Sequence, residues 1–447
     1  MSLDQSFSTE NFRAILDMEN RKGVFLEGEF FPKAERVINL IKKYNQEIRL
    51  LTKLGILPNR VEFMKRWVKR LKSVKERVLM ASLEEVSRKV TERSFQIRLR
   101  PVSISGGDTI YLTDKCPENY FAMKQLQKNM YRLFQVKQSN RYSIISQLKI
   151  LLEDKFPKYV VRTDISSFYE SIPHEQAHAL TQGNNLLCPL SKKLIRQVLS
   201  EYKRLTGNDI GIPRGIGISA YLAELYMRDF DELIREIPGV TYYARYVDDI
   251  VVVFTPLSNE PARDYRQEVQ GKIEFMHLTM NPSKTIEVDL LSTSVSHQIE
   301  YLGYEIVFGG GKVSTRLSNK KVNKYRTRVD NAIAEYNSLS KIDEKKARSI
   351  LVKRIRFLTG NTRLTNNKRN VLIGIYYSNS QLTDTSALVG LDLYLQTKIA
   401  TEIHSASLQN RLMKYGFHQG YDTKRFSPFS TKDLSEIMRA WKPKVWP

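Results

Sequence analysis

The feature that most constrains this chain is a pair of adjacent aspartates, Asp248 and Asp249, inside the stretch RYVDDIVVVF at residues 245–254. Apolar and β-branched residues flank the pair, which predicts two strands joined by a tight turn. Aspartate is also common in turns because its side chain bonds to nearby backbone, so turn chemistry alone is one interpretation. Adjacent carboxylates repel each other, however, and burying either without a counter-charge is costly. A divalent cation would resolve both problems.

A third carboxylate, Asp164, ends another apolar stretch, YVVRTD at residues 159–164. A strand-end cap is the plainer interpretation of Asp164 taken alone. Two strands that each deliver aspartate at one end predict three carboxylates around two Mg²⁺ ions. Such ions, roughly 3.5–4 Å apart, stabilise the attacking and leaving oxygens of an in-line phosphoryl displacement. Together the three aspartates predict a metal-dependent phosphoryl-transfer site.

The overall charge indicates the class of partner. The chain has 71 Lys and Arg against 48 Asp and Glu, a formal net charge of +23. This excess favours a phosphate-backbone partner, with an anionic membrane as the second candidate. We find no apolar run near 18 residues, no secretory leader and no lipidation signal, so we expect a cytoplasmic protein without membrane contact. The two cysteines lack CxxC spacing and the histidines lack an HExxH pattern, which argues against a zinc site.

Periodicity divides the chain into three expected regions. Residues 1–94 form a helical N-terminal region, with helical spacing from about 33 to 95 and a break at Gly55 and Pro58. Residues 95–312 mix strand-like and helical patterns. Residues 313–447 begin with a basic amphipathic helix and stay mainly helical to about residue 412. We therefore place a boundary near residue 312.

Short motifs follow one another in a recognisable order: DISSFY at 164–169, GIPRG at 211–215, SAYLAELYMRDFD at 219–231, YVDD at 246–249, NPSK at 281–284 and YLGY at 301–304. The series resembles the palm motifs of reverse transcriptases, in that family's chain order, from about residue 95 to 310. Glu224 and the stretches RIRFLTGN and VLIGIYYSN resemble bacterial reverse transcriptases of the abortive-infection and phage-defence group, and within it the smaller enzyme of a type 3 defence system.

The resemblance implies an α+β, right-hand polymerase fold. Residues 95–312 would form fingers and a palm with an antiparallel sheet, and residues 313–447 a helical thumb and a C-terminal extension. It also implies that Asp164 and Asp248 bind both metal ions, with Asp249 adjacent and the carbonyl of Ile165 as a further ligand. The ions are expected to be Mg²⁺, with Mn²⁺ as the alternative.

The resemblance implies a set of nucleotide-binding residues: Arg141, Phe168, Tyr169, Pro213, Arg214, Gly215 and Lys284. The ring of Tyr169 would collide with a ribose 2′-OH but not with deoxyribose, which predicts selection of dNTPs. The alternative is that Phe168 and Tyr169 are both core aromatics. The turn around Gly215 would support the templating base and the nucleotide, because glycine allows close backbone approach. A surface position is the alternative for Arg214.

Two cations are expected at the triphosphate. Lys284 would neutralise the departing pyrophosphate or give it a proton. Arg141 would bind phosphate oxygens from the fingers, a role for which Arg98 and Arg100 are competing candidates.

Primer-binding residues are implied in two places. The hairpin YLG would hold the primer end, although an ordinary strand and turn is the alternative for the Tyr301 side chain. The basic helix after residue 312 would follow a duplex backbone. The expected residues are Tyr301, Leu302, Gly303, Lys320, Lys321, Lys324, Arg326 and Arg328.

The predicted reaction is RNA-directed DNA synthesis. The expected partners are an RNA template, the DNA product and dNTPs, and the resemblance to the defence group implies that the template is a noncoding RNA. A companion reverse transcriptase or other defence protein, and a homo-oligomer, stay open. Two alternatives also stay open: an RNA-synthesising palm polymerase and a catalytically worn RNA-binding scaffold.

Overall fold

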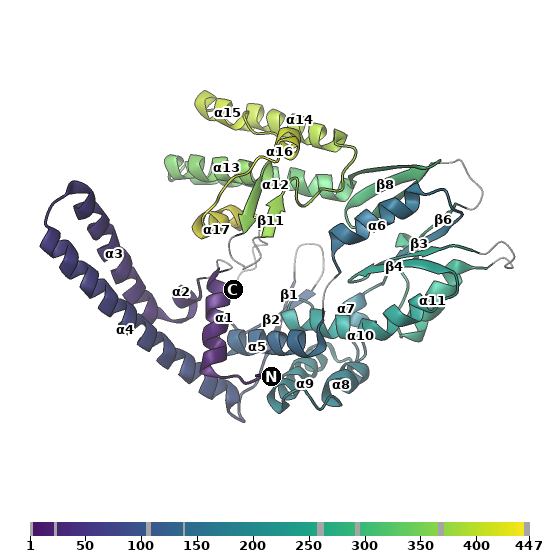
Figure 1. The fold of residues 1–447 in the computed structure, drawn as a ribbon, viewed down its shortest axis with the longest axis horizontal. Helices are drawn as coiled ribbons and strands as arrows, with labels where there is room; N and C mark the ends of the chain where they lie inside the picture. The colour runs from purple at the N-terminus through teal and green to yellow at the C-terminus, as the bar shows by residue number, and fades with distance from the viewer. Residues whose placement is uncertain are drawn as a thin grey trace.

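The computed structural model describes residues 3–21, 25–103, 109–136, 139–256, 263–290, 296–364 and 371–441. The N-terminal region is helical, with α1 (Thr9–Arg21), α2 (Leu26–Phe30), α3 (Pro32–Leu54) and α4 (Pro58–Thr91). Helices α3 and α4 form a long antiparallel pair that projects away from the rest of the molecule (Figure 1). The predicted break between them is present: Gly55 ends α3 in the left-handed conformation, and α4 begins at Pro58.

The region expected to form fingers begins with an antiparallel hairpin of β1 (Leu99–Ser103) and β2 (Thr109–Thr113). Helices α5 (Pro117–Phe134) and α6 (Arg141–Glu153) follow. Beyond the next strand come the helices α7 (Phe168–Ser171), α8 (His174–Gln182), α9 (Pro189–Thr206) and α10 (Gly217–Arg235).

The palm sheet has four antiparallel strands in the order β4-β5-β3-β6. Its strands are β3 (Tyr159–Asp164), β4 (Val240–Tyr246), β5 (Asp249–Phe254) and β6 (Ile286–Asp289), with α11 (Tyr265–Phe275) and the 3₁₀ turn η1 (Pro282–Lys284) between β5 and β6.

Strand β5 explains why the apolar run IVVVF has no polar interruption. Ile250, Val252 and Phe254 belong to one core, shared with the N-terminal helices and α5, α9, α10 and α11. Val251 and Val253 point the other way, into a second core shared with α6 and the C-terminal half. A strand covered on both faces is apolar at every position rather than alternating. Strand β5 therefore separates the two cores and contributes side chains to both.

The C-terminal half begins on a second antiparallel sheet, β7-β8-β9, formed by β7 (His297–Tyr301), β8 (Tyr304–Gly309) and β9 (Lys312–Leu317). Helices α12 (Asn319–Ser340) and α13 (Glu344–Leu358) and the hairpin of β10 (Asn361–Leu364) and β11 (Val371–Gly374) follow. The last helices are α14 (Ser386–Glu402), α15 (Ala406–Leu412), α16 (Phe417–Asp422) and α17 (Thr431–Arg439).

The predicted α+β class is confirmed by these antiparallel sheets and the helices that cover them. The sheet of β7, β8 and β9 continues across residue 312, and its core is shared with the thumb helices. The three-region division of the chain stays a prediction. Across the described residues, no helix has the length and apolar character needed to cross a membrane.

Candidate active site

Strand register brings the three aspartates to one end of the palm sheet. Asp164, the last residue of β3, lies opposite Asp249, the first residue of β5. Asp248 lies in the turn before β5, and its carbonyl accepts a hydrogen bond from the backbone N–H of Ile165 at 3.2 Å. The turn is tight, because Val247 takes a φ of 63°, where β-branched residues are rare. All three aspartates line one open cavity of about 850 Å³.

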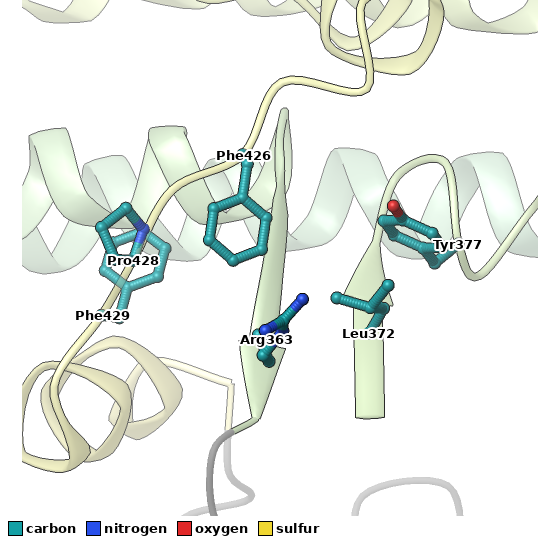
Figure 2. A pocket seen from close by; sticks show the side chains of 6 residues that line it. All are labelled: Arg363, Leu372, Tyr377, Phe426, Pro428 and Phe429. Carbon is teal, nitrogen blue, oxygen red and sulfur yellow. The ribbon is translucent and has the colours of Figure 1, made fainter. Parts of the chain in front are cut away.

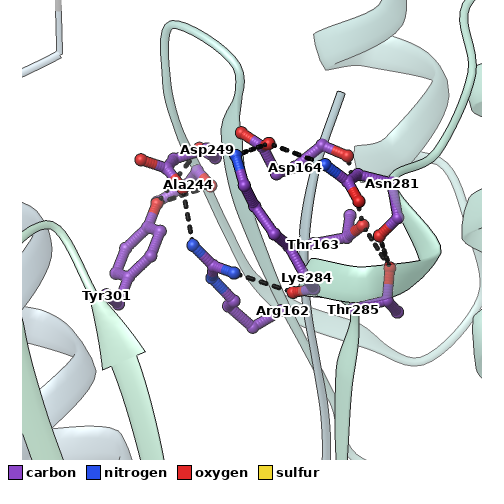
Figure 3. Close-up of polar contacts among 9 residues, drawn as sticks. All are labelled: Arg162, Thr163, Asp164, Ala244, Asp249, Asn281, Lys284, Thr285 and Tyr301. Carbon is purple, nitrogen blue, oxygen red and sulfur yellow. Dashed lines mark hydrogen bonds and ion pairs between the residues drawn. The ribbon is translucent and has the colours of Figure 1, made fainter. Parts of the chain in front are cut away.

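Two cations contact the carboxylates directly, as Figure 3 shows. The Nζ of Lys284 lies 2.5 Å from Oδ2 of Asp164, whose residue is only 3% exposed. The Nη2 of Arg162 lies 2.8 Å from Oδ1 of Asp249, and its Nη1 donates to the carbonyl of Lys284 at 2.7 Å. Arg162 therefore joins Asp249 to the segment that carries Lys284.

Asp248 is the least neutralised of the three. It forms no ion pair with any residue that the structure describes. Burial, followed by the charge of Asp164, raises the pKa of Asp248 to about 6. Burial also raises the pKa of Asp249, although the charge of Arg162 opposes this. The site thus concentrates negative charge that its own cations only partly offset.

Part of the cavity lining is basic. Of the cations expected at phosphates, five line this cavity together with Lys284: Arg141, Lys320, Lys321, Lys324 and Arg328. Leu302 and Gly303 line it as well. The cavity therefore combines three carboxylates with this group of basic residues, which we call the basic wall. The combination suits a phosphate chain neutralised by metal ions at one end.

Comparison with known proteins gives the family of this region. Residues 111–306 match the family model of reverse transcriptase (RNA-dependent DNA polymerase). This segment is a reverse transcriptase domain. It contains the three aspartates, Lys284 and the hairpin at 301–304, so the predicted resemblance is confirmed at the level of the domain.

Two solved structures that resemble the chain are telomerases. One is apo telomerase from Candida tropicalis, truncated from its C-terminal domain, with a TM-score of 0.36, 12% identity and coverage of 51% of this chain and 56% of that chain. The other is telomerase from Candida albicans in complex with a TWJ fragment of telomeric RNA, with a TM-score of 0.37, 11% identity and coverage of 80% and 66%. The chain thus spans between about half and two thirds of those proteins. No curated protein sequence matches it significantly.

The donor chemistry of the reverse transcriptase domain fits a hard divalent cation. Carboxylate oxygens are the ligands that Mg²⁺ prefers, and three of them line one cavity with charge left uncompensated at Asp248. In the described part of the chain, no three acidic, histidine or cysteine side chains already converge as a ligand set. Lys284 occupies one oxygen of Asp164 and Arg162 one oxygen of Asp249. Metal binding therefore requires side-chain rearrangement, most simply the withdrawal of Lys284.

Phe168 and Tyr169 differ in their surroundings. Phe168 is 2% exposed and belongs to the core. The alternative interpretation of both rings as core aromatics therefore holds for Phe168. Tyr169 is only partly buried, and burial, followed by the charge of Asp248, raises the pKa of its phenol. The guanidinium of Arg214 lies 5.9 Å from the centre of the Tyr169 ring. The role of Tyr169 in nucleotide selection stays a prediction.

The GIPRG turn packs against the fingers hairpin. The backbone N–H of Tyr111 donates to the carbonyl of Arg214 at 2.7 Å. Gly215 has a φ of 107°, and a Cβ there would lie 2.8 Å from the carbonyl oxygen of Tyr111. Only glycine fits this approach. Pro213 accepts a hydrogen bond at its carbonyl from the hydroxyl of Ser219 at 2.7 Å, which ties the turn to α10.

The cavity lining leaves out eight expected site residues: Phe168, Tyr169, Pro213, Arg214 and Gly215, described above, and Ile165, Tyr301 and Arg326. Tyr301 is fully buried, and its hydroxyl points to the carbonyls of Ala244 and Asp249 at 3.4 and 3.3 Å, so its side chain supports the palm sheet (Figure 3). The guanidinium of Arg326 lies 5.3 Å from the ring centre of Tyr394. Ile165 is buried behind the aspartates.

Sequence reasoning missed Arg162 and Arg245. Arg162 could have been noticed, because it is a cation inside an otherwise apolar strand, two residues before Asp164. Arg245 is 6% exposed and donates to Glu224 at 2.9 Å, to Asp231 at 2.7 and 2.9 Å, and to the carbonyl of Val247 at 3.0 Å. It fixes the strained turn that presents Asp248 and Asp249. Glu224, singled out in the sequence for another reason, is thus a structural partner.

Proposed function

We propose that this protein is an RNA-directed DNA polymerase that joins dNTPs to a primer end on an RNA template. The observation that carries the proposal is the single cavity that collects Asp164, Asp248, Asp249 and Lys284 inside the reverse transcriptase domain. In the proposed reaction, a 3′-hydroxyl oxygen gives up its proton to solvent and attacks the α-phosphorus of a dNTP. A new P–O bond forms as the bond from the α-phosphorus to the oxygen of the β-phosphate breaks, and pyrophosphate leaves. A protein hydroxyl that primes synthesis is a variant of the same chemistry.

The three aspartates would hold two Mg²⁺ or Mn²⁺ ions, with the carbonyl of Ile165 as a further ligand. When bound, these ions supply positive charge to the attacking and leaving oxygens. Asp248, which has no ion-pairing partner among the described residues, provides an unclaimed carboxylate for this task. Arg162 holds Asp249 in place from the side of β3.

Lys284 would serve the leaving group. Its ammonium is already held in the cavity by Asp164, and it is carried on the rigid η1 turn. Once released from Asp164, the ammonium can neutralise pyrophosphate or donate a proton to it. The residues of the basic wall would position the phosphates of the nucleotide and of the primer strand.

Two cations of that wall are especially suited to phosphate. Arg141 and Lys321 both lie 5.0 Å from the ring centre of Tyr304, and Nε and Nη2 of Arg141 are buried without a hydrogen-bond partner in the described structure. Buried donors without partners are unfavourable unless a ligand satisfies them. A phosphate oxygen would do so.

The test is a primer extension assay on one sequence supplied as an RNA or a DNA template, with dNTPs or rNTPs. The proposal predicts extension on RNA with dNTPs. Preferential use of rNTPs would instead support the RNA-synthesising alternative. Binding of RNA without any synthesis, under Mg²⁺ or Mn²⁺, would support the scaffold alternative.

We also propose that the enzyme acts in bacterial antiviral defence, in the cytoplasm, with a noncoding RNA as template and a companion protein. Glu224 and the stretches RIRFLTGN and VLIGIYYSN support this through their resemblance to the defence group. Phage challenge of bacteria that carry the complete gene neighbourhood tests it. Protection should be lost when Asp248 and Asp249 are both changed to Ala, and equal survival with and without the locus would contradict it.

A further inference from the structure

A second cavity, of about 340 Å³, lies in the C-terminal region outside the reverse transcriptase domain. We call it the C-terminal aromatic pocket. Figure 2 shows the hairpin of β10 and β11 on one side and the segment before α17 on the other. The pocket is lined by Arg363, Leu372, Tyr377, Phe426, Pro428 and Phe429. Three of these six side chains are aromatic, so flat ring surfaces dominate it.

The rings are held in place although they face solvent. The backbone N–H of Asn361 donates to the carbonyl of Arg425 at 2.7 Å, and the N–H of Ser427 donates to the carbonyl of Asn361 at 2.7 Å. These bonds fix Phe426 beside β10, yet Phe426 is 49% exposed and Tyr377 is 37% exposed. Exposed rings on a rigid backbone are unfavourable in water and suit a flat ligand that stacks on them.

The charge at the pocket is positive. Arg363 is exposed, and no carboxylate in the described part of the chain pairs with it. The guanidinium of Arg356 lies 5.8 Å from the ring centre of Phe429. None of the residues lining the pocket is acidic. Aromatic faces beside an unpaired arginine are the combination that binds a nucleobase together with its phosphate.

The C-terminal aromatic pocket adjoins the active-site cavity through consecutive residues. Tyr377 lines the pocket, and Ser378 lines the cavity that holds the aspartates. Nζ of Lys321, from the basic wall, donates to the carbonyl of Ser378 at 3.3 Å. The C-terminal aromatic pocket therefore lies beside the active-site cavity.

We propose that the C-terminal aromatic pocket binds an unpaired nucleotide of the RNA template, with its base stacked on Phe426 and Tyr377 and its phosphate on Arg363. The inference rests on the proposed RNA-directed synthesis. The product DNA leaves such a site paired with its template, so the strand that is single-stranded beside the cavity is template that has not been copied. The pocket would hold that strand in line and prevent it from folding back.

The test measures the affinity of the full-length protein for two labelled RNA–DNA duplexes by fluorescence anisotropy. One duplex is blunt, and the other carries an RNA overhang of about ten nucleotides, within the span of a single-strand site. The wild-type protein should bind the overhang duplex more tightly. Phe426→Ala, Tyr377→Ala and Arg363→Gln should each weaken overhang binding by about 5- to 150-fold, with binding of the blunt duplex unchanged.

Phe275→Ala is the matched control, because Phe275 is 69% exposed on α11 and lines neither cavity. It should bind both duplexes as the wild-type protein does. A DNA overhang of the same sequence distinguishes the strand: tight RNA binding with weak DNA binding supports the proposal, and equal or stronger DNA binding overturns the assignment to template. Wild-type affinity for the RNA overhang in Phe426→Ala and Tyr377→Ala would overturn the pocket itself.

The primer extension assay separates this inference from the proposed function. If the wild-type protein makes no DNA but the pocket variants still lose overhang binding, the polymerase proposal fails and the pocket stands as an RNA site only. If DNA is made and the variants bind the overhang normally, the pocket proposal fails alone. Crosslinking of a 4-thiouridine placed in the overhang should map to the peptide that contains Phe426.

Discussion

The ammonium of Lys284 lies 2.5 Å from Oδ2 of Asp164, in the cavity where the aspartates would hold metal ions. In this arrangement the lysine and a divalent cation compete for one carboxylate. The same lysine is also the group best placed to meet the departing pyrophosphate. The pair therefore connects metal binding to nucleotide chemistry through one side chain.

Lys284→Ala separates these two effects. Removing the ammonium frees Asp164, so the Mg²⁺ concentration that gives half-maximal activity should fall. The maximal rate should fall by about a hundredfold or more, because the leaving group loses its acid. A Mg²⁺ titration of single-nucleotide incorporation measures both. Lys65→Ala, on the exposed face of α4, should change neither, and an unchanged rate in Lys284→Ala would remove the lysine from the reaction.

Arg245→Met tests the support of the aspartate turn. The change leaves the partly buried carboxylates of Asp231 and Glu224 without a counter-charge. It should lower the free energy of unfolding by about 3–5 kcal/mol. Activity should also fall in the folded fraction, because the carbonyl of Val247 loses its donor. Urea denaturation measures the first effect. Arg348→Met, which breaks only an exposed pair with Glu344, should cost about 0.3–0.5 kcal/mol.

Tyr169→Val tests sugar selection. Removing the ring should lower the preference for dNTPs over rNTPs by about 10- to 200-fold, the range for loss of a single steric contact in a pocket. Tyr169→Phe keeps the ring and should keep the preference. Competition between labelled dNTP and rNTP on one template gives the ratio directly. Unchanged selectivity in Tyr169→Val would support the interpretation of Tyr169 as a packing residue.

Lys321 should make nucleic-acid binding depend on pH. Burial, together with the charges of Arg141 and Lys324, lowers the pKa of Lys321 from 10.5 to about 7. A phosphate favours the charged form, so affinity for a duplex should fall as pH rises through about 7, with uptake of a proton on binding. Lys321→Arg, which stays charged, should show a flatter profile. Parallel pH profiles for the two proteins would contradict this assignment.

The lowered pKa of Lys321 also predicts how the stability of the free protein changes with pH. Between pH 7 and 10.5 the unfolded chain holds the Lys321 proton that the folded protein has released. The free energy of unfolding of the free protein should therefore rise with pH across that window, because the folded state is relieved of a buried charge. Lys321→Arg should lack this rise.

The palm was predictable because its sequence signals are local. The run from Ile250 to Phe254 is apolar at every position, and a strand with two covered faces requires that pattern. Asp164 and Asp249 each stand at a strand end, and antiparallel register then places them opposite each other. These local features are enough to identify the three aspartates as a candidate site.

The surroundings of the site were not predictable from local patterns. Arg141 was expected in the fingers, but the structure places it beside Gly303 and Tyr304, where β7 turns into β8. The partners of Arg245 depend on how α10 packs on β4. Contacts between residues so far apart in the chain follow from tertiary packing. The C-terminal aromatic pocket, formed by the hairpin and the segment after Arg425, is of the same kind.

The most direct test of the central claim is primer extension by the double variant Asp248→Ala, Asp249→Ala on an RNA template with dNTPs and Mg²⁺. The account predicts that the wild-type protein extends the primer and that the double variant does not, while both bind the duplex. Extension by the double variant at the wild-type rate would contradict the account.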